Sequence, residues 1–367
     1  MVIPWCLDRK DCIFMKLRLP NYYKQFHCIA NECKENCCTA GWEIDIDTKS
    51  ANFYNSISGK FGDKLHTHIN FNTPSHFILD NNNKCPFLNS DNLCEIYINL
   101  GKDCLCEICT EHPRYYEWFD GVKEGGIGLC CEEVARIILS QTEPFSTYEV
   151  EIPYEDCDEY DTNVFSYLIN ARAKILSYLN DDTRHFDSRI HDVLWYCYTI
   201  QQNLDSELLD DEEIFSVSTS TRPNLLAILN FFLTLEHNDA NWIIWFKNCI
   251  NNYSNSLDKM EDFEKDNPDV FQYLKNISIY FIWRYFLKGV FDGEVLSKVK
   301  LMVVSIAVIK FLLFCKWLEN GVLSFEDCIW VVKKYSEEVE YSDDNLIALA
   351  EASYDEEFFS VEGLLGT

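Results

Sequence analysis

The feature that most constrains this chain is a run of cysteines at residues 33–38, which read CKENCC. Cys33, Cys37 and Cys38 belong to a stretch, residues 28–131, that holds 11 of the 18 cysteines in the 367-residue chain. In a reducing environment, thiols gathered at this density are typical of metal ligands or redox groups. The run therefore predicts a fold built around a thiolate-ligated metal centre.

The first residues, MVIPWCLDRK, lack a basic segment followed by a long apolar segment, so we see no secretory signal. We therefore expect a cytoplasmic protein, in which clustered cysteines bind metal or act in redox chemistry. A disulfide-rich secreted domain is the alternative. The longest apolar run, residues 301–318, contains Lys310 and Lys316. These charges favour a buried core helix over a membrane span.

The overall charge narrows the classes of partner. The formal net charge is −29, which repels nucleic acid and anionic lipid and attracts cationic partners. The simpler interpretation is that the acidity only keeps the protein soluble. Hydrophobic residues make up 47% of the chain and aromatic residues 15%, enough for one large domain or two unequal ones.

The composition changes along the chain and predicts its organisation. Residues 1–14 form an N-terminal extension, residues 15–140 a cysteine-rich metal-cluster domain of short helices and loops, and residues 141–160 a linker with Pro144 and Pro153. Apolar residues at positions 164, 168, 171, 175 and 179 then mark one face of a helix. Similar patterns follow near 187–203, 222–236, 240–252, 269–290, 295–319 and 324–340. The predicted fold is mainly α, with a cysteine-rich irregular N-terminal unit followed by an all-helical domain, residues 161–367.

The cysteine spacing leaves the type of metal open. Zinc takes four tetrahedral ligands, often from paired knuckles, and iron–sulfur clusters also take thiolates. Two adjacent cysteines, Cys37 and Cys38, strain a single tetrahedral ion and favour a larger cluster or two neighbouring centres. We expect the cysteines outside the clustered region to be inert: Cys157, Cys197, Cys249, Cys315 and Cys328 buried in the connector or on helices, and Cys6 and Cys12 in the extension.

Two cofactor motifs are missing. The chain has no C-x3-C-x2-C spacing of a radical enzyme, because Cys38 follows Cys37 directly. The glycines of residues 125–128 lack the preceding strand-helix-strand pattern of a dinucleotide-binding loop, so we interpret them as a plain turn.

Several motifs together resemble the flagellin lysine-N-methylase family and, more distantly, the zinc- or iron-chelating CxxCC proteins. These motifs are PNYY at 20–23, the cysteine run with Gly41 and Trp42, CPFL at 85–88, LCEIY at 93–97, Pro113-Arg114, and Cys131-x3-Ala135-Arg136. The resemblance covers most of the chain from Met15, and the helical half matches only loosely. A family proline after Cys131 is replaced here by Glu132.

The resemblance implies an enzyme that transfers methyl groups from S-adenosyl-L-methionine to lysine side chains of flagellin. It also implies a 4Fe-4S cluster, with zinc as the alternative metal. The ligand pool carried over by motif is Cys28, Cys33, Cys37, Cys38, Cys85, Cys94, Cys109 and Cys131. Cys104, Cys106 and Cys130 fit the pattern less well.

Methylating a lysine requires removal of its proton, since the reference pKa is about 10.4. Asp45 and Asp47 alternate after Trp42, and on a strand both carboxylates face one side, where they are expected to orient the substrate ammonium. An ordinary solvated strand edge is the alternative. Tyr97 is expected to bind the cationic groups on its ring face, with other tyrosines of the region (Tyr22, Tyr23 and Tyr115), unless they only pack. Arg114 is the candidate partner for the carboxylate of S-adenosyl-L-methionine, or else part of a structural ion pair.

Two other classes of function remain open at this level. One is a non-catalytic metal module that transfers electrons or chelates metal. The other is a structural scaffold that bound zinc stabilises and that binds a protein partner.

Overall fold

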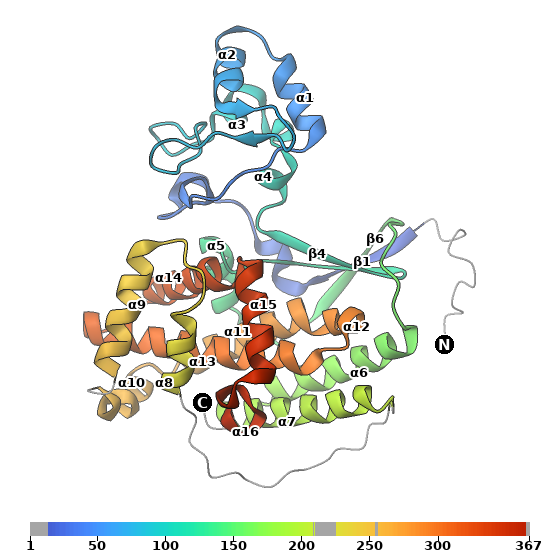
Figure 1. Cartoon of the computed structure of the whole chain (residues 1–367), viewed down its shortest axis with the longest axis vertical. Coiled ribbons are helices and arrows are strands. Elements are labelled where there is room, and N and C mark those ends of the chain that lie inside the picture. The colour runs from blue at the N-terminus through green and yellow to red at the C-terminus, as the bar shows by residue number, and fades with distance from the viewer. Residues whose placement is uncertain (1–13, 208, 210–224, 254–255, 365–367) are drawn as a thin grey trace.

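The computed structural model describes residues 14–207, 209, 225–253 and 256–364. Within them the chain divides into a large helical body and a smaller lobe, residues 30–112, that stands above one side of the body (Figure 1). The lobe is inserted between the first strand and the rest of the body. It is therefore joined to the body by two chain segments. Of the extension expected at residues 1–14, only Phe14 is described.

A four-stranded sheet lies between the lobe and the helices. Its strands are β1 (Phe14–Pro20), β4 (Arg114–Phe119), β5 (Val122–Ile127) and β6 (Thr147–Pro153), in the order β4-β5-β1-β6. β1 runs parallel to β5, with Leu17 opposite Lys123, and antiparallel to β6, with Leu17 opposite Val150. The sequence predicted an irregular unit and a linker here, but the segment 141–160 contains a strand of the sheet.

The glycines of residues 125–128 do not form the plain turn that we predicted. Gly125 and Gly126 lie inside β5, where the aromatic side chains of β4 cover them. A Cβ atom at Gly126 would lie 2.3 Å from the hydroxyl oxygen of Tyr115. The glycines are there because a side chain would collide with the tyrosines of the neighbouring strand.

The helices of the body confirm the prediction of a mainly α fold. Their bounds are α5 (Glu132–Leu139), α6 (Thr162–Leu179), α7 (Phe186–Asp205), α8 (Leu225–Phe232), α9 (Ala240–Tyr253), α10 (Met260–Asp266), α11 (Val270–Tyr285), α12 (Gly289–Asp292), α13 (Val295–Asn320), α14 (Phe325–Tyr335), α15 (Asp343–Asp355) and α16 (Val361–Leu364). A π-helical turn, η7 (Ser336–Glu340), follows α14 directly. The apolar spacing predicted most of these helices to within a few residues, because one apolar face of each helix is buried.

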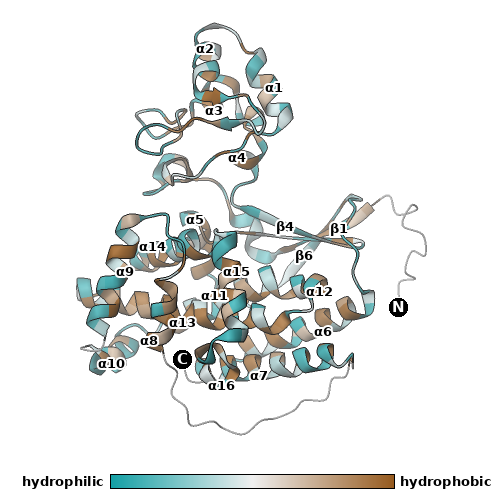
Figure 2. Ribbon diagram, in the orientation of Figure 1, coloured by the Kyte–Doolittle hydropathy of each residue, from teal (hydrophilic) through white to brown (hydrophobic). Residues whose placement is uncertain are grey.

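Helix α13 is the centre of the hydrophobic core. It is long and apolar enough to span a membrane, with a mean hydropathy of 2.2 over its most apolar window, but 72% of that window is buried inside the protein. It packs against α7, α11, α14 and α15. The core prediction for residues 301–318 is therefore confirmed. In Figure 2, hydrophobic residues are concentrated on the helices of the body.

The lobe has its own small core. Its elements are α1 (Thr48–Ser56), α2 (Gly59–His68), α3 (Glu95–Leu100), α4 (Glu107–Glu111) and the two-stranded pair β2 (Ile69–Asn70) and β3 (His76–Phe77). The core contains eleven buried residues: Ile44, Ile46, Ala51, Tyr54, Leu65, Ile69, Phe77, Cys85, Phe87, Ile96 and Cys106. Two of the eleven are cysteines, so thiols take part in the interior of the lobe.

Candidate functional site

One group of cysteines lies inside the lobe. We call it the lobe thiols: Cys38, Cys85, Cys94, Cys106 and Cys109. Cys85 and Cys106 belong to the lobe core, and the other three pack against it half-buried. Backbone pairing holds the segments together, because the Cys85 N–H donates to the Cys38 carbonyl at 2.8 Å and Cys94 forms a β-bridge with Leu88.

Hydrogen bonds link the lobe thiols in pairs. The Cys109 thiol donates to the Cys106 sulfur, which lowers the pKa of Cys106 and raises that of Cys109. The Cys37 thiol donates in the same way to Cys38, and this bond lowers the pKa of Cys38. A bond to Cys85 and burial outweigh it, so the pKa of Cys38 is raised to about 12. The widest of these pairs, Cys38 and Cys85, joins cysteines that lie 47 positions apart in the chain.

A second group lies where the lobe meets the body. We call it the seam thiols: Cys28, Cys33, Cys37 and Cys131. Cys131 is the residue before α5, so it belongs to the body, whereas Cys33 and Cys37 lie in the cysteine run of the lobe. Burial raises the pKa of Cys33 to about 12, and the charges of Cys131, Glu132, Cys28 and Cys37 add to the shift. Burial likewise raises the pKa of Cys131 to about 11, with Cys37 and Cys28 contributing.

The donor chemistry of both groups fits a thiolate-ligated metal. In the described part of the chain every cysteine is a free thiol, so none of them is consumed in a disulfide. Within those same residues, no three His, Cys, Asp or Glu side chains are already arranged as a metal site. A metal ion replaces the thiol protons when it binds, and this offsets the raised pKa values. The metal centre itself stays a prediction.

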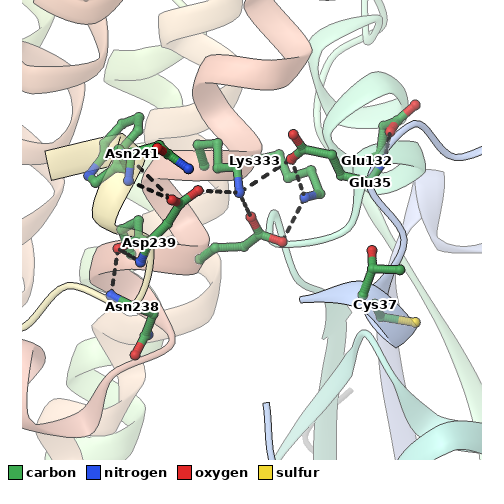
Figure 3. A network of polar contacts seen from close by, with 12 residues as sticks. Glu35, Cys37, Glu132, Asn238, Asp239, Asn241 and Lys333 are labelled. Atoms are coloured by element: carbon green, nitrogen blue, oxygen red, sulfur yellow. Dashed lines mark hydrogen bonds and ion pairs between the residues drawn. The ribbon is translucent and has the colours of Figure 1, made fainter. Parts of the chain in front are cut away.

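A hydrogen bond and two ion pairs join the cysteine run to the body. The Glu132 carboxylate on α5 accepts the backbone N–H of Lys34 at 2.9 Å. Glu35 pairs with Lys333 and Lys334 of α14, each at 3.3 Å. Figure 3 shows Glu35 beside Glu132, with Lys333 facing Glu35 and with Cys37 below them in the view. The backbone that carries the seam thiols is thus held by charged groups from two helices of the body.

A second set of ion pairs also joins the cysteine run of the lobe to the body, nearer the solvent. Glu326 on α14 accepts from Arg136 at 2.6 Å and pairs with Lys34 at 2.8 Å. The hydrogen bonds from Arg136 and Lys34 lower the pKa of Glu326 to about 2. Because these groups are largely exposed, they orient the lobe more than they stabilise it.

A buried polar cluster lies in the body beneath the seam. The Glu340 carboxylate, in η7, pairs with Arg284 of α11 at 2.9 Å and accepts from the hydroxyls of Tyr280 at 2.6 Å and Tyr285 at 2.8 Å. The Ser336 hydroxyl donates to its other oxygen at 2.6 Å. We call these five residues the Arg284 cluster. A buried charge pair with its oxygens satisfied, on a π-helical turn, is a frequent mark of a functional site.

The Arg284 cluster reaches the seam through aromatic rings. The Arg284 guanidinium lies over the rings of Tyr115 at 4.5 Å and Tyr341 at 5.1 Å. Tyr341 in turn contacts Trp42 of the lobe, with ring centroids 5.8 Å apart. A Cβ atom at Gly128 would lie 2.2 Å from the Tyr341 hydroxyl, so only glycine fits beside this ring. The ring of Tyr341 therefore links the buried cluster to the lobe.

The structure gives the two predicted carboxylates different places. Asp45 is exposed and forms a single β-bridge with His76, so the predicted strand through Asp45 and Asp47 is wrong. Asp47 instead caps α1: one carboxylate oxygen accepts the Ser50 N–H at 2.8 Å and the other accepts the Glu107 N–H at 2.9 Å. No strand forms at Asp47 because its carboxylate accepts from N–H groups at the first turns of two helices, α1 and α4.

The other two predicted residues lie on other elements, α3 and β4. Tyr97 is on α3 and is 52% exposed. Arg114 begins β4 in the body, where its guanidinium packs on the rings of Tyr23 and Phe26 and donates to the Thr110 carbonyl at 3.1 Å. Their proposed roles remain predictions.

The sequence reasoning missed two parts of the site. It placed Cys106 outside the ligand pool, although its C-x2-C spacing with Cys109 was a signal for a shared ligand pair. It also missed Arg284 and Glu340, which lie 56 positions apart in the chain and belong to no motif. The contact between them depends on the packing of α11 against η7 and has no local sequence signature.

Comparison with known proteins matches the helical part of the chain to a known family. The family described as FliB lysine N-methylase C-terminal domain matches residues 158–367, which is more than half of the chain. The lysine-N-methylases of Salmonella typhimurium and Salmonella choleraesuis are each 26% identical over 147 residues, which cover 36% of this chain and 35% of the relative. The flagellar biosynthetic protein FliU of Salmonella muenchen is 24% identical over 143 residues, 35% of this chain and 80% of that protein.

The matched stretch thus spans about a third of the length of the two lysine-N-methylases. No solved structure matches the chain. The family match covers the helices that carry the Arg284 cluster and the ion pairs of α14. The chain therefore belongs to the FliB lysine N-methylase family.

Proposed function

We propose that this protein is a lysine N-methyltransferase that acts on flagellin, with S-adenosyl-L-methionine as the methyl donor. The observation that carries the proposal is the family match over residues 158–367. The names of the relatives, a lysine-N-methylase and a flagellar biosynthetic protein, support both the reaction and the substrate. The net charge of −29 favours a partner that presents lysines.

The reaction is a direct displacement. The neutral lysine nitrogen attacks the sulfonium methyl group, the C–N bond forms as the C–S bond breaks, and S-adenosylhomocysteine leaves. The lysine must first give up its proton to a nearby base or to water, since its reference pKa is about 10.4. Positioning of the two reactants and desolvation of the amine supply most of the rate.

Within this proposal, we assign different roles to the predicted residues. One N–H of Arg114 donates to the Thr110 carbonyl, and its other N–H groups are proposed to bind the carboxylate of S-adenosyl-L-methionine. Asp45 and Tyr97 are exposed on the lobe and are available to attract a substrate lysine. Asp47 has both oxygens engaged in capping, so any effect of this residue on catalysis would be exerted through the lobe.

The proposed cofactor is a 4Fe-4S cluster, with zinc as the alternative, held by cysteines of the ligand pool. When bound, such a cluster supplies a cross-link between thiolates from distant parts of the chain. The free thiols also support our proposal of a cytoplasmic protein, because thiols stay reduced there.

Co-expression with flagellin tests the proposal. Intact-mass spectrometry of the purified flagellin is expected to show a series of added methylene masses on lysines, which disappears when the chain is omitted. Flagellin that stays unmodified, although the chain is folded and binds metal, would contradict the proposal and favour a non-catalytic metal module.

A matched pair of variants tests the role of Arg114. Arg114→Gln is expected to raise the KM for S-adenosyl-L-methionine about tenfold or more, because hydrogen bonds to charged groups contribute about 1.5–3 kcal/mol. The control is Lys102→Gln, which removes an exposed positive charge from the lobe. If the two variants have the same KM, Arg114 does not bind the methyl donor.

A further inference from the structure

A pocket lies between the sheet and the helices that cover it. Tyr115, Glu117 and Phe119 alternate along β4, so their side chains share one face of the strand, and all three line the pocket. Trp283 of α11 and Leu287 of the short helix η6 (Phe286–Lys288) line it from the side of the helices. Aromatic and apolar side chains therefore form walls around the carboxylate of Glu117.

Two glutamates of the sheet face each other in this pocket. Glu117 of β4 lies opposite Glu124 of β5, and both line the pocket. Like charges in directly opposed positions repel each other, so each carboxylate needs a cation. The buried Glu124 accepts from Arg172 at 2.6 and 2.7 Å and from Arg18 at 3.1 Å. The charge of Glu124 is therefore matched by arginines of the body itself.

The cation that pairs with Glu117 is held less firmly. It is Lys288, whose Nζ lies 3.2 Å from the carboxylate, and the side chains of Lys288 and Glu117 are 44% and 28% exposed. Ion pairs between exposed side chains contribute little to stability, so little free energy is lost when the ammonium leaves the carboxylate. The pair thus shows which kind of group Glu117 binds, and it leaves that group free to exchange.

Withdrawal of Lys288 leaves the pocket with one unmatched negative charge. Arg284 also lines the pocket, but its guanidinium is paired with Glu340 at 2.9 Å. Tyr115 offers a further polar group, since its hydroxyl is buried and has no hydrogen-bond partner in the part of the chain that the structure describes. A ligand with one positive charge on an apolar stem matches these features, because the stem packs on the rings while the charge reaches Glu117.

We propose that the pocket binds a lysine side chain of the protein substrate, whose ammonium replaces that of Lys288 on Glu117. The inference rests on the proposed function for the nature of the substrate and adds a recognition site to it. Arg114, the proposed partner of the methyl donor, belongs to the other set of alternating residues in β4 and packs on Tyr23 and Phe26. The lysine in the pocket is therefore a second lysine, distinct from the one that is methylated.

Ligand-detected NMR with the full-length protein tests the pocket. The probe is Nα-acetyl-lysine N-methylamide, and the comparison compound is its norleucine analogue, which has the same stem without the ammonium. The wild type is expected to bind the lysine probe about tenfold more tightly, and Glu117→Gln is expected to abolish this preference. Lys288→Met is expected to tighten the binding of the lysine probe about two- to fivefold, because it removes the internal competitor.

The opposite effects of the two variants are the decisive result, because a purely structural ion pair gives the same effect from either side. The matched control is the ion pair of Lys310 on α13 with Glu264 on α10, 2.7 Å apart, on helices that do not line the pocket. Lys310→Met and Glu264→Gln are expected to bind the probe as the wild type does. Wild-type protein without a preference for the lysine probe, or Lys288→Met protein that binds it more weakly, would overturn the proposal.

A methylation assay separates this proposal from the proposed function. Glu117→Gln is expected to raise the KM for flagellin more than it lowers kcat, as for a residue that binds the substrate away from the reacting atoms. Methylation of flagellin by a protein whose pocket shows no preference for lysine would overturn the recognition site alone. Lysine binding without methylation would overturn the proposed function alone.

Discussion

The body and the lobe are stabilised in different ways. The body buries long apolar helices around α13, and its core is continuous from the sheet to α16. The lobe has a core of eleven buried residues, and three further cysteines pack against that core. Small units bury too little apolar surface to be stable without an added cross-link. The comparison predicts that the lobe depends on an added cross-link, such as the proposed metal, more than the body does.

The largest expected effect is that of metal removal on the lobe. Anaerobic chelation should unfold the lobe and leave the body folded, because structural metal sites in small units contribute about 10 kcal/mol or more. Hydrogen-exchange mass spectrometry would detect lost protection in α1, α2 and α3 and unchanged protection in α13. Equal loss in both regions would contradict the comparison.

The second-largest effect is a loss of stability that is expected in the body and not in the lobe. Arg284→Met leaves the Glu340 carboxylate buried without its cation and should reduce the free energy of unfolding by about 3–5 kcal/mol. Chemical denaturation followed by circular dichroism measures the change. Metal content is expected to stay at the wild-type level, and a simultaneous loss of metal would show that the two regions are not independent.

A smaller effect separates capping from catalysis at Asp47. Asp47→Ala should destabilise the lobe by about 1 kcal/mol, because α1 and α4 each lose a hydrogen bond to the carboxylate. Asp47→Asn keeps one acceptor oxygen and removes the charge. If Asp47 only caps, the Asn variant should retain most of the methylation rate. A loss of about a hundredfold or more, without unfolding, would instead indicate direct participation.

The smallest effect is expected at the outer edge of the seam. The pKa of Glu326 is lowered to about 2, so the ion pairs with Arg136 and Lys34 are complete above about pH 4.5. Their contribution is lost as the pH falls through the folded pKa, and it is small because solvent screens these exposed groups. The protection factors of the amides in residues 33–38, corrected for the intrinsic exchange rate at each pH, should therefore decrease at low pH in the wild type and change less in Glu326→Gln. The same decrease in both proteins would show that Glu326 does not hold this segment.

The sequence predicted the helices of the body well because each buries one face. Apolar residues such as Val164, Leu168 and Ile175 recur at the helical period, and this periodicity needs no knowledge of the partner helix. The sheet was missed for the opposite reason. β1 pairs with β5 and β6, more than a hundred positions away, and the polar alternation of β6 resembles an acidic linker.

The candidate site was predictable only in its chemistry. The density of cysteines indicated which residues to group, but the division between lobe and seam depends on contacts such as that of Cys38 with Cys85. The Arg284 cluster is likewise a product of packing, since Arg284 and Glu340 stand out only when α11 and η7 meet. Asp47 was placed on a strand because an aspartate after alternating residues fits a strand edge as well as a helix cap.

The central claim is that thiols of the lobe and the seam converge on bound metal in an enzyme that methylates flagellin. The most direct test measures iron, sulfide and zinc in anaerobically purified protein and assays flagellin methylation on the same sample. The account predicts bound metal, with activity that falls as metal is withdrawn. A folded preparation that is fully active and contains no metal would contradict it.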